Sequence, residues 1–133
     1  MKNVKSFIGV FSHNTIPTLG NKKLSLIVNY DNYSGSGTHW ICIYNDPTKR
    51  YVEFFDSYGI YPSSHIQTIL RKLKKPILYN SGQIQSVKSN RCGWYCMDYI
   101  KKRERGKSPG DIIFEYKPNG SLDNDRKLIR LLE

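Results

Sequence analysis

Residues 39–59 read HWICIYNDPTKRYVEFFDSYG, and this stretch decides how the chain is expected to fold. Its two ends, 39–44 and 51–55, are rich in β-branched and aromatic residues and flank a turn-forming Asn-Asp-Pro sequence. This pattern predicts two antiparallel strands joined by a short turn. The hairpin would bring His39, at the start of its first strand, close to Asp56, at the end of its second.

Strand signals continue on both sides of this hairpin. The apolar segment 7–11 predicts a strand, and segment 24–30 alternates apolar side chains with period two, which predicts a half-buried strand. Two more short strands are expected at 77–79 and 84–87. The side chains expected on the core face of segment 24–30 are Leu24, Leu26, Val28 and Tyr30.

Helical signals dominate the second half of the chain. Segment 64–75 repeats apolar residues at helical spacing, Ser64 with Gln67 resembles a capping box, and Pro76 would end the helix. Strands gathered early and helices later predict an α+β fold. Two further helices are expected over residues 92–105 and 122–132.

A chain of 133 residues suits one domain with a modest core, so we expect a single domain over residues 1–133. No apolar run approaches the roughly 20 residues of a membrane span, and no signal peptide is recognisable. We therefore expect a soluble protein that is made in the cytosol and is not secreted. The odd number of cysteines argues against a disulfide framework, and we expect Cys42 and Cys96 to be core residues. No second Cys/His pair has zinc spacing, so no metal site is expected.

The formal net charge is +10, from 21 basic and 11 acidic residues. Such an excess favours anionic partners such as nucleic acid, an acidic protein or a membrane surface. Basic residues are densest over 71–75 and 101–107, and each run alone is explained by a solvated helix face. The excess over the whole chain is harder to explain in that way.

Cys92 points most directly to a chemistry. It begins a predicted helix, is followed by Gly93, and has Asn90 placed to cap that helix. Unpaired N–H groups and the helix dipole favour a thiolate at such a position, and a nearby His39 imidazolium would favour it further. The alternative is a buried cysteine that only packs beneath the helix, which is the commoner fate of cysteine.

Three further residues supply the groups that cysteine-based acyl transfer requires. His39 begins a strand just after a Gly-rich loop and is the best of three histidines for the general base. Asp56 would fix the ring tautomer and stabilise the imidazolium, unless it only forms a turn. Gln85 would donate its amide N–H to the developing oxyanion, together with the main-chain N–H of Cys92 or Gly93.

This ordered set resembles the adenain-like cysteine proteases, the adenovirus maturation protease family with relatives in virophages and Polinton-like viruses. That family orders its residues His, Asp or Glu, Gln, Cys, and the separations of 17 residues from His39 to Asp56 and 7 from Gln85 to Cys92 look like its own. The segments that carry the resemblance are 39–40 (HW), 55–59 (FDSYG), 85–87 (QSV) and 92–96 (CGWYC).

The resemblance implies a papain-like α+β fold in the arrangement shared by adenain and the ubiquitin-like-protein proteases. The cysteine helix would then pack on a central, mostly antiparallel sheet. It also implies Cys92 as nucleophile, His39 as general base and acid, Asp56 as orienting carboxylate and Gln85 as oxyanion donor. The expected activity is a viral endopeptidase that cleaves virion precursor proteins.

The resemblance also sets expectations for partners and location. The adenoviral member is stimulated by DNA, and the charge of +10 fits DNA binding. We expect no required cofactor, no membrane partner, a monomer, and a location in the virion and the infected host cell. Two alternatives stay open, namely a protease for ubiquitin-like modifiers, which shares the residue order and fold, and a non-catalytic basic nucleic-acid-binding domain.

Overall fold

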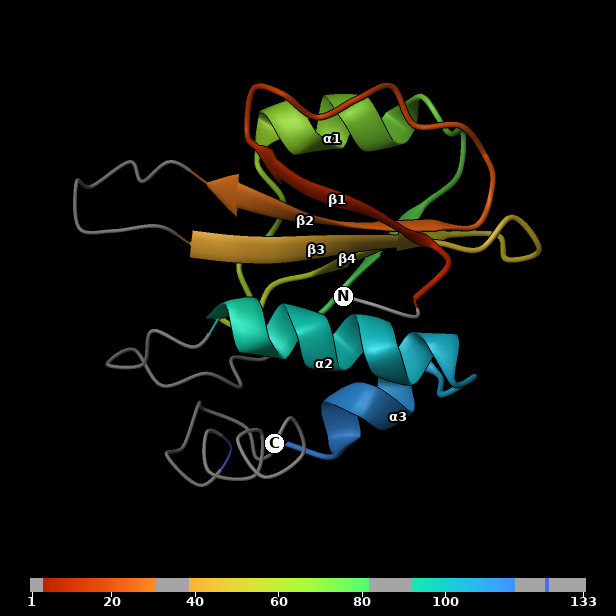
Figure 1. Cartoon of the computed structure of the whole chain (residues 1–133). Coiled ribbons are helices and arrows are strands. Elements are labelled where there is room, and N and C mark those ends of the chain that lie inside the picture. The colour runs from red at the N-terminus through yellow and green to blue at the C-terminus, as the bar shows by residue number, and fades with distance from the viewer. Residues whose placement is uncertain (1–3, 31–38, 82–91, 117–123, 125–133) are drawn as a thin grey trace.

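The computed structural model describes residues 4–30, 39–81, 92–116 and 124. A five-stranded sheet in the order β1-β2-β3-β4-β5 lies between α1 on one face and α2 with α3 on the other (Figure 1). The expected α+β class is confirmed. The elements are β1 (Phe7–Ser12), β2 (Leu24–Tyr30), β3 (His39–Asn45), β4 (Val52–Phe55), α1 (Ser64–Arg71), β5 (Ile77–Tyr79), α2 (Cys92–Glu104) and α3 (Pro109–Phe114).

The predicted hairpin is present as β3 and β4, which pair antiparallel from Cys42↔Phe55 to Asn45↔Val52. The sheet as a whole is mixed, because β2–β3 and β3–β4 are antiparallel while the outer pairs β1–β2 and β4–β5 are parallel. Parallel neighbours need a crossover between them. Residues 13–23 supply it between β1 and β2, and α1 supplies it between β4 and β5.

The prediction that segment 24–30 is half-buried is wrong, because both faces of β2 are covered. Leu24, Leu26 and Val28 pack in the core beneath α1, as the alternation predicted. Ile27 points to the other face and packs in the core beneath α2. A strand in a sheet covered on both sides has no solvated face, whatever its alternation suggests.

α1 covers the first face with Ile66 and Leu70, both completely buried. Its N-cap is Ser63, whose hydroxyl accepts a hydrogen bond from the Ile66 N–H at 3.3 Å, so the cap lies one residue before the predicted Ser64. The helix also ends earlier than expected. Lys74 has a left-handed φ of 58°, which breaks the helical path before Pro76.

α2 covers the second face of the sheet. Its Tyr95, Cys96, Tyr99 and Ile100 form the predicted buried stripe, and they pack against Cys42, Tyr44 and Phe55 of the sheet. α3, which the sequence did not predict as a helix, follows a turn at Gly106 and is capped by the Ser108 hydroxyl. The strand expected at 84–87 and the helix expected at 122–132 lie outside the described residues, apart from Asn124.

A buried ion pair ties α2 to the sheet. The Arg103 guanidinium donates from Nε to Glu53 Oε1 at 2.8 Å and from Nη2 to Glu53 Oε2 at 2.9 Å. The Tyr99 hydroxyl donates to Glu53 Oε1 at 2.6 Å, and the guanidinium lies 4.7 Å from the Tyr44 ring centroid. Bidentate contacts of this kind fix orientation as well as distance.

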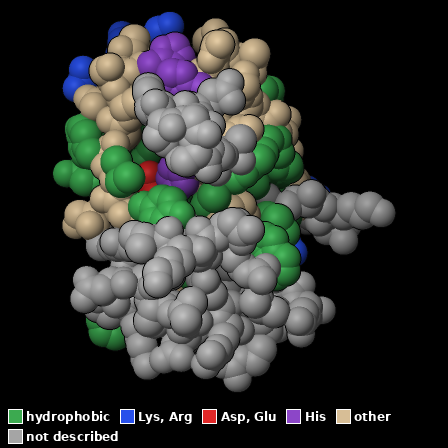
Figure 2. All heavy atoms as spheres, turned by 90° about the vertical axis from the view of Figure 1, so that its left-hand side faces the viewer, with side chains coloured by type: hydrophobic (Ala, Val, Ile, Leu, Met, Phe, Trp, Pro, Cys, Tyr) green, Lys and Arg blue, Asp and Glu red, His purple; other side chains and the backbone are tan. Residues whose placement is uncertain are grey.

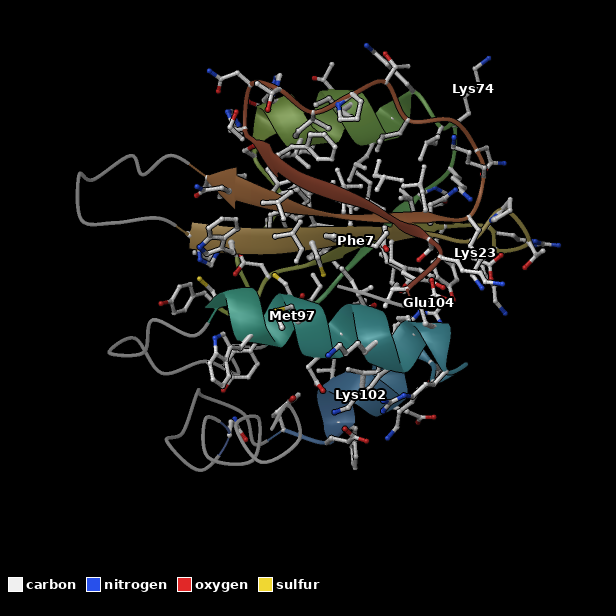
Figure 3. All side chains as sticks on the ribbon, viewed as in Figure 1. Phe7, Lys23, Lys74, Met97, Lys102 and Glu104 are labelled. Atoms are coloured by element: carbon white, nitrogen blue, oxygen red, sulfur yellow. The ribbon has the colours of Figure 1, made fainter. Side chains whose placement is uncertain are left out.

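A second polar cluster joins α2 to α3. Lys102, labelled on α2 in Figure 3, contacts Asp98 at 2.8 Å and also binds Glu115. Asp98 accepts a further hydrogen bond from the Tyr116 hydroxyl.

Among the helices that the structure describes, none has the length and apolar character of a membrane span.

Candidate active site

Three of the four predicted site residues meet at one end of the sheet. His39 is the first residue of β3, Asp56 follows the last residue of β4, and Cys92 is the first residue of α2. The start of β3 and the start of α2 lie at the same end of the molecule (Figure 1). Figure 2 views that end and shows a histidine and an acidic side chain in contact among hydrophobic side chains.

The antiparallel hairpin brings His39 and Asp56 together. His39 Nε2 lies 2.9 Å from Asp56 Oδ1, and Asp56 is only 1% exposed. The same oxygen accepts the Tyr58 main-chain N–H at 2.8 Å, in the turn that follows β4. The carboxylate is therefore held in place by the chain around it and fixes the orientation of the imidazole ring.

The Cys92 sulfur has a main-chain hydrogen-bond donor. The Trp40 N–H points at Sγ with a distance of 3.3 Å. Asn29 of β2 lies opposite Trp40 of β3, and its carbonyl accepts the His13 N–H on the β1 side. Asn29 and Trp40 are therefore a non-hydrogen-bonded pair, and the backbone groups of Trp40 point away from β2, toward β4. The pairing of β4 with β3 ends at Cys42↔Phe55, so no strand residue accepts the Trp40 N–H. The Cys92 sulfur is its acceptor instead.

His39 carries a raised pKa in this setting. Burial is the largest single influence and lowers it, but hydrogen-bond and charge interactions with Asp56 and Cys92 together outweigh burial and raise the pKa of His39 from 6.5 to about 9. Nε2 is engaged by Asp56, while Nδ1 is buried and makes no hydrogen bond of standard geometry within the described residues. Asp56 therefore engages one ring nitrogen of His39 and leaves the other, Nδ1, without a carboxylate contact.

Aromatic side chains enclose the histidine and the cysteine. The Tyr58 ring lies 4.7 Å from the His39 ring at an interplanar angle of 34°, and the Tyr30 ring lies 6.0 Å away on another side. The Trp40 indole lies beside Gly93, 3.8 Å from where a Cβ would stand. The His39 side chain is 19% exposed beside these rings, whereas Cys92 is only 3% exposed.

The other two cysteines are core residues, as predicted. Cys42 on β3 and Cys96 on α2 are completely buried in the core between the sheet and that helix. Burial, followed by the neighbouring Cys42 thiol, raises the pKa of Cys96 well above its usual value, which keeps Cys96 protonated. Cys92 therefore differs from both in lying at a helix start beside an imidazole.

Gln85, the predicted oxyanion donor, and Asn90, the predicted helix cap, lie outside the described residues. Sequence reasoning missed Tyr58, although an aromatic residue two positions after Asp56 was a usable signal. It also missed the Trp40 N–H, for which a main-chain group leaves no signal. Within the described part of the chain, no group of three or more His, Cys, Asp or Glu residues is arranged to hold a metal ion.

Comparison with known proteins identifies the fold. No protein-family model matches the sequence, and no curated protein matches it. Two crystal structures of the ASFV pS273R protease, one with selenomethionine, match with TM-scores of 0.61 and 0.58 at 22% and 20% identity. Both matches cover 68% of this chain, but only 38% and 36% of the protease chain.

A structure of the SUMO protease Ulp1, with its catalytic cysteine oxidised to a sulfonic acid, matches with a TM-score of 0.42 at 15% identity. That match covers 67% of this chain and 47% of Ulp1, and its score is too low to support an argument. The described chain spans about two fifths of the length of the ASFV pS273R protease and shares its α+β fold. The α+β fold that the resemblance to adenain-like cysteine proteases implied is thereby confirmed, with the helix that begins at Cys92 packed on the sheet. The sheet is mixed, with two antiparallel and two parallel pairs, and not mostly antiparallel as expected.

Proposed function

We propose that this chain is a cysteine endopeptidase in which Cys92 attacks the scissile carbonyl. The observation that carries the proposal is the meeting of three groups from distant segments: the Asp56 carboxylate on His39 Nε2, the imidazole beside Cys92, and the Trp40 N–H on the sulfur. Core cysteines such as Cys96 have no such surroundings.

The proposed reaction begins with transfer of the thiol proton from Cys92 to His39. The raised pKa of His39, about 9, supports an imidazolium at neutral pH, with the thiolate stabilised by the Trp40 N–H. The thiolate attacks the carbonyl carbon, and the imidazolium gives its proton to the leaving amine as the C–N bond breaks. Water, deprotonated by His39, then hydrolyses the thioester and restores the thiol.

The tetrahedral intermediate needs hydrogen-bond donors for its oxyanion. The main-chain N–H of Cys92 belongs to the first turn of α2, where such groups have no intrahelical partner. Gln85 is the proposed second donor, on the strength of its position seven residues before Cys92. One donor of this kind is worth roughly 2.7–4 kcal/mol of activation free energy.

Virion precursor proteins are the proposed substrates, and the virion and infected cell the proposed location. Support comes from the fold shared with a protease whose name assigns it to ASFV. The same geometry would serve a protease for ubiquitin-like modifiers, so substrate identity requires its own test. We propose that the chain works as a monomer, without a cofactor or a membrane partner.

The charge distribution supports DNA as a stimulating partner. Several acidic side chains are consumed by internal pairs, such as Glu53 with Arg103 and Asp98 with Lys102, which leaves the basic excess to the surface. Lys74 and Lys23, which pairs with Glu104 at 3.7 Å, lie on the side of the molecule away from the start of β3 (Figure 3). A polyanion bound there would leave the end that carries Cys92 accessible.

The activity is tested by incubating the structural polyproteins of the same genome, and separately a ubiquitin-like conjugate, with wild type and Cys92→Ala. Mass spectrometry should find cleavage products with wild type alone, and Cys96→Ala, which removes a buried thiol four residues on, should remain active. His39→Ala should be nearly as inactive as Cys92→Ala, Asp56→Asn less affected, and Gln85→Ala lowered mainly in kcat.

Retained turnover in Cys92→Ala would rule out the thiol mechanism. Cleavage of the conjugate but not of the polyproteins would assign the modifier-protease alternative. If neither the polyproteins nor the conjugate is cut, and an alkylating reagent labels Cys92 no faster than Cys42 or Cys96, the result favours the alternative of a non-catalytic nucleic-acid-binding domain. DNA should raise activity at low salt and lose that effect as salt increases, and a salt-independent response would exclude DNA stimulation.

A further inference from the structure

Asn80 contacts the main chain of Asp56 with both ends of its carboxamide. The Asp56 N–H donates to Asn80 Oδ1 at 3.0 Å, and Asn80 Nδ2 donates to the Asp56 carbonyl at 2.6 Å. Asn80 follows β5 directly and is 24 residues from Asp56 in sequence. No sequence pattern singled it out.

The sheet explains why Asp56 needs this partner. The parallel pairing of β4 with β5 ends at Phe54↔Tyr79. The Val52 N–H donates to the Pro76 carbonyl on the β5 side, and Asp56, four residues further along an extended chain, directs its backbone groups to the same side. Like a peptide group, a carboxamide combines an N–H donor with a C=O acceptor. The Asn80 side chain therefore continues the hydrogen bonding between β4 and β5 beyond Phe54↔Tyr79, where their strand pairing ends.

The same residue carries the carboxylate of the proposed site. Asp56 Oδ1 receives His39 Nε2 at 2.9 Å and the Tyr58 N–H at 2.8 Å. Immediately afterwards the chain reverses, since the Gly59 N–H closes a turn on the Asp56 carbonyl at 2.8 Å. Asn80 therefore holds the last extended residue before a turn, where a small rotation of the backbone would move Oδ1 away from the imidazole.

We propose that Asn80 is a positioning residue, whose carboxamide holds the Asp56 main chain so that Oδ1 stays on Nε2 of His39. The proposal rests on the proposed function for its kinetic consequences, but not for its effect on His39. It gives the loop after β5 a direct part in aligning the site.

The test compares Asn80→Ala with Asn45→Ala. Asn45 is a useful control, because it too is a carboxamide held by hydrogen bonds, to Asn21 Oδ1 at 3.1 Å and to the Lys22 carbonyl at 2.8 Å, although Asn45 is buried and Asn80 is half-buried. It lies at the opposite end of β3 from His39. Asn45→Ala should lose at least as much thermal stability, because its side chain is the more deeply buried, so a loss of kcat confined to Asn80→Ala reports on the site.

We expect Asn80→Ala to lower kcat on the order of 10- to 100-fold with little change in KM, as a small displacement of a catalytic group does. The alkaline limb of its pH–activity profile should also move to lower pH, because a displaced Asp56 stabilises the His39 imidazolium less. Asn45→Ala should keep the kcat and the pH profile of wild type. If Asn80→Ala does not fold, Asn80→Ser replaces it in the test. This variant retains a single hydroxyl, and it should lower kcat and move the alkaline limb of the pH profile in the same directions.

A second measurement separates this inference from the proposed function. In the inactive Cys92→Ala background, NMR titration of the His39 ring should show its midpoint lowered by Asn80→Ala and unchanged by Asn45→Ala. An unchanged midpoint, or unchanged kcat and pH profile, would assign Asn80 a purely structural role. Absence of any proteolysis by wild type would defeat the proposed function alone, since the His39 midpoint does not depend on it.

Discussion

The two faces of the central sheet are built from different chemistry. The core beneath α1 is almost wholly aliphatic, with Leu26, Ile41 and Ile66 among its completely buried members. The core beneath α2 contains stacked aromatic rings, such as Phe55 with Tyr99, and it adjoins the buried Glu53–Arg103 pair. Apolar contact stabilises without fixing direction, whereas a bidentate ion pair fixes both distance and angle.

This difference bears on the site because Cys92 and Arg103 belong to the same helix. Arg103 is eleven residues after Cys92 on α2, about 16 Å along the helix axis. Anchoring one end of α2 to Glu53 restricts how the other end can rotate over His39 and Trp40. We expect the α1 face to set stability and the α2 face to set alignment as well, and four experiments test that division.

The largest effect should follow from breaking the buried ion pair. Glu53→Gln leaves the Arg103 guanidinium buried without a counter-charge, which should lower the free energy of unfolding by about 3–5 kcal/mol. Urea denaturation measures this loss.

The double variant Glu53→Leu with Arg103→Met sharpens the result. Removing both charges should recover most of the lost stability, while kcat stays below that of wild type because α2 is no longer anchored in one orientation. A double variant with full activity would show that the ion pair does not align Cys92.

The next effect in size should come from Leu70→Ala on the α1 face. Leu70 is completely buried, and its truncation should cost about 2–3 kcal/mol, the lower part of the usual range because the last turn of α1 can shift. Below its melting temperature the variant should keep the kcat of wild type. A fall in kcat beyond the unfolded fraction would contradict the division between the two faces.

A smaller effect should appear in the pH dependence of stability. The pKa of His39 lies near 9 in the folded chain, above its usual 6.5, so the stabilisation is fully present below pH 6.5 and is lost as the pH rises through 9. The difference in unfolding free energy between wild type and His39→Gln should therefore shrink, on the order of 1–2 kcal/mol, between these limits. A difference independent of pH would show that His39 is not held by Asp56 and Cys92.

The smallest effect should come from Ser63→Ala, which removes the N-cap of α1. Loss of its hydrogen bond to the Ile66 N–H should cost about 1 kcal/mol without affecting kcat. Ser64→Ala is the matched control, because it is the serine that the sequence predicted as the cap, and thermal unfolding should find it nearly neutral. The reverse order would place the cap at Ser64.

Local pattern was sufficient for the strands. The bounds of β2 and the antiparallel pairing of β3 with β4 follow from period-two alternation and an Asn-Asp-Pro turn. The sequence could not tell that β2 is covered on both faces, because coverage depends on where α1 and α2 dock. It also placed the α1 cap one residue late, since two adjacent serines are equally good caps.

The structure brings together three side chains that the sequence singled out, and it adds two groups that no sequence pattern indicated. The predicted hairpin placed His39 beside Asp56, and the resemblance to adenain-like cysteine proteases implied that Cys92 lies beside them. The Trp40 N–H and the Asn80 carboxamide were missed, because their roles arise from where strand pairing stops. Such ladder ends exist only in three dimensions.

The donor to the Cys92 sulfur is a peptide N–H, and every amino acid except proline brings one to position 40. Substitution there can reshape the wall beside Gly93 without removing the hydrogen bond to the Cys92 sulfur. Under the proposed function, saturation mutagenesis of this one codon should yield variants with altered peptide selectivity that retain the main-chain donor to Cys92. Proline is the one substitution in such a library that would remove this donor, and the proline variant should be inactive.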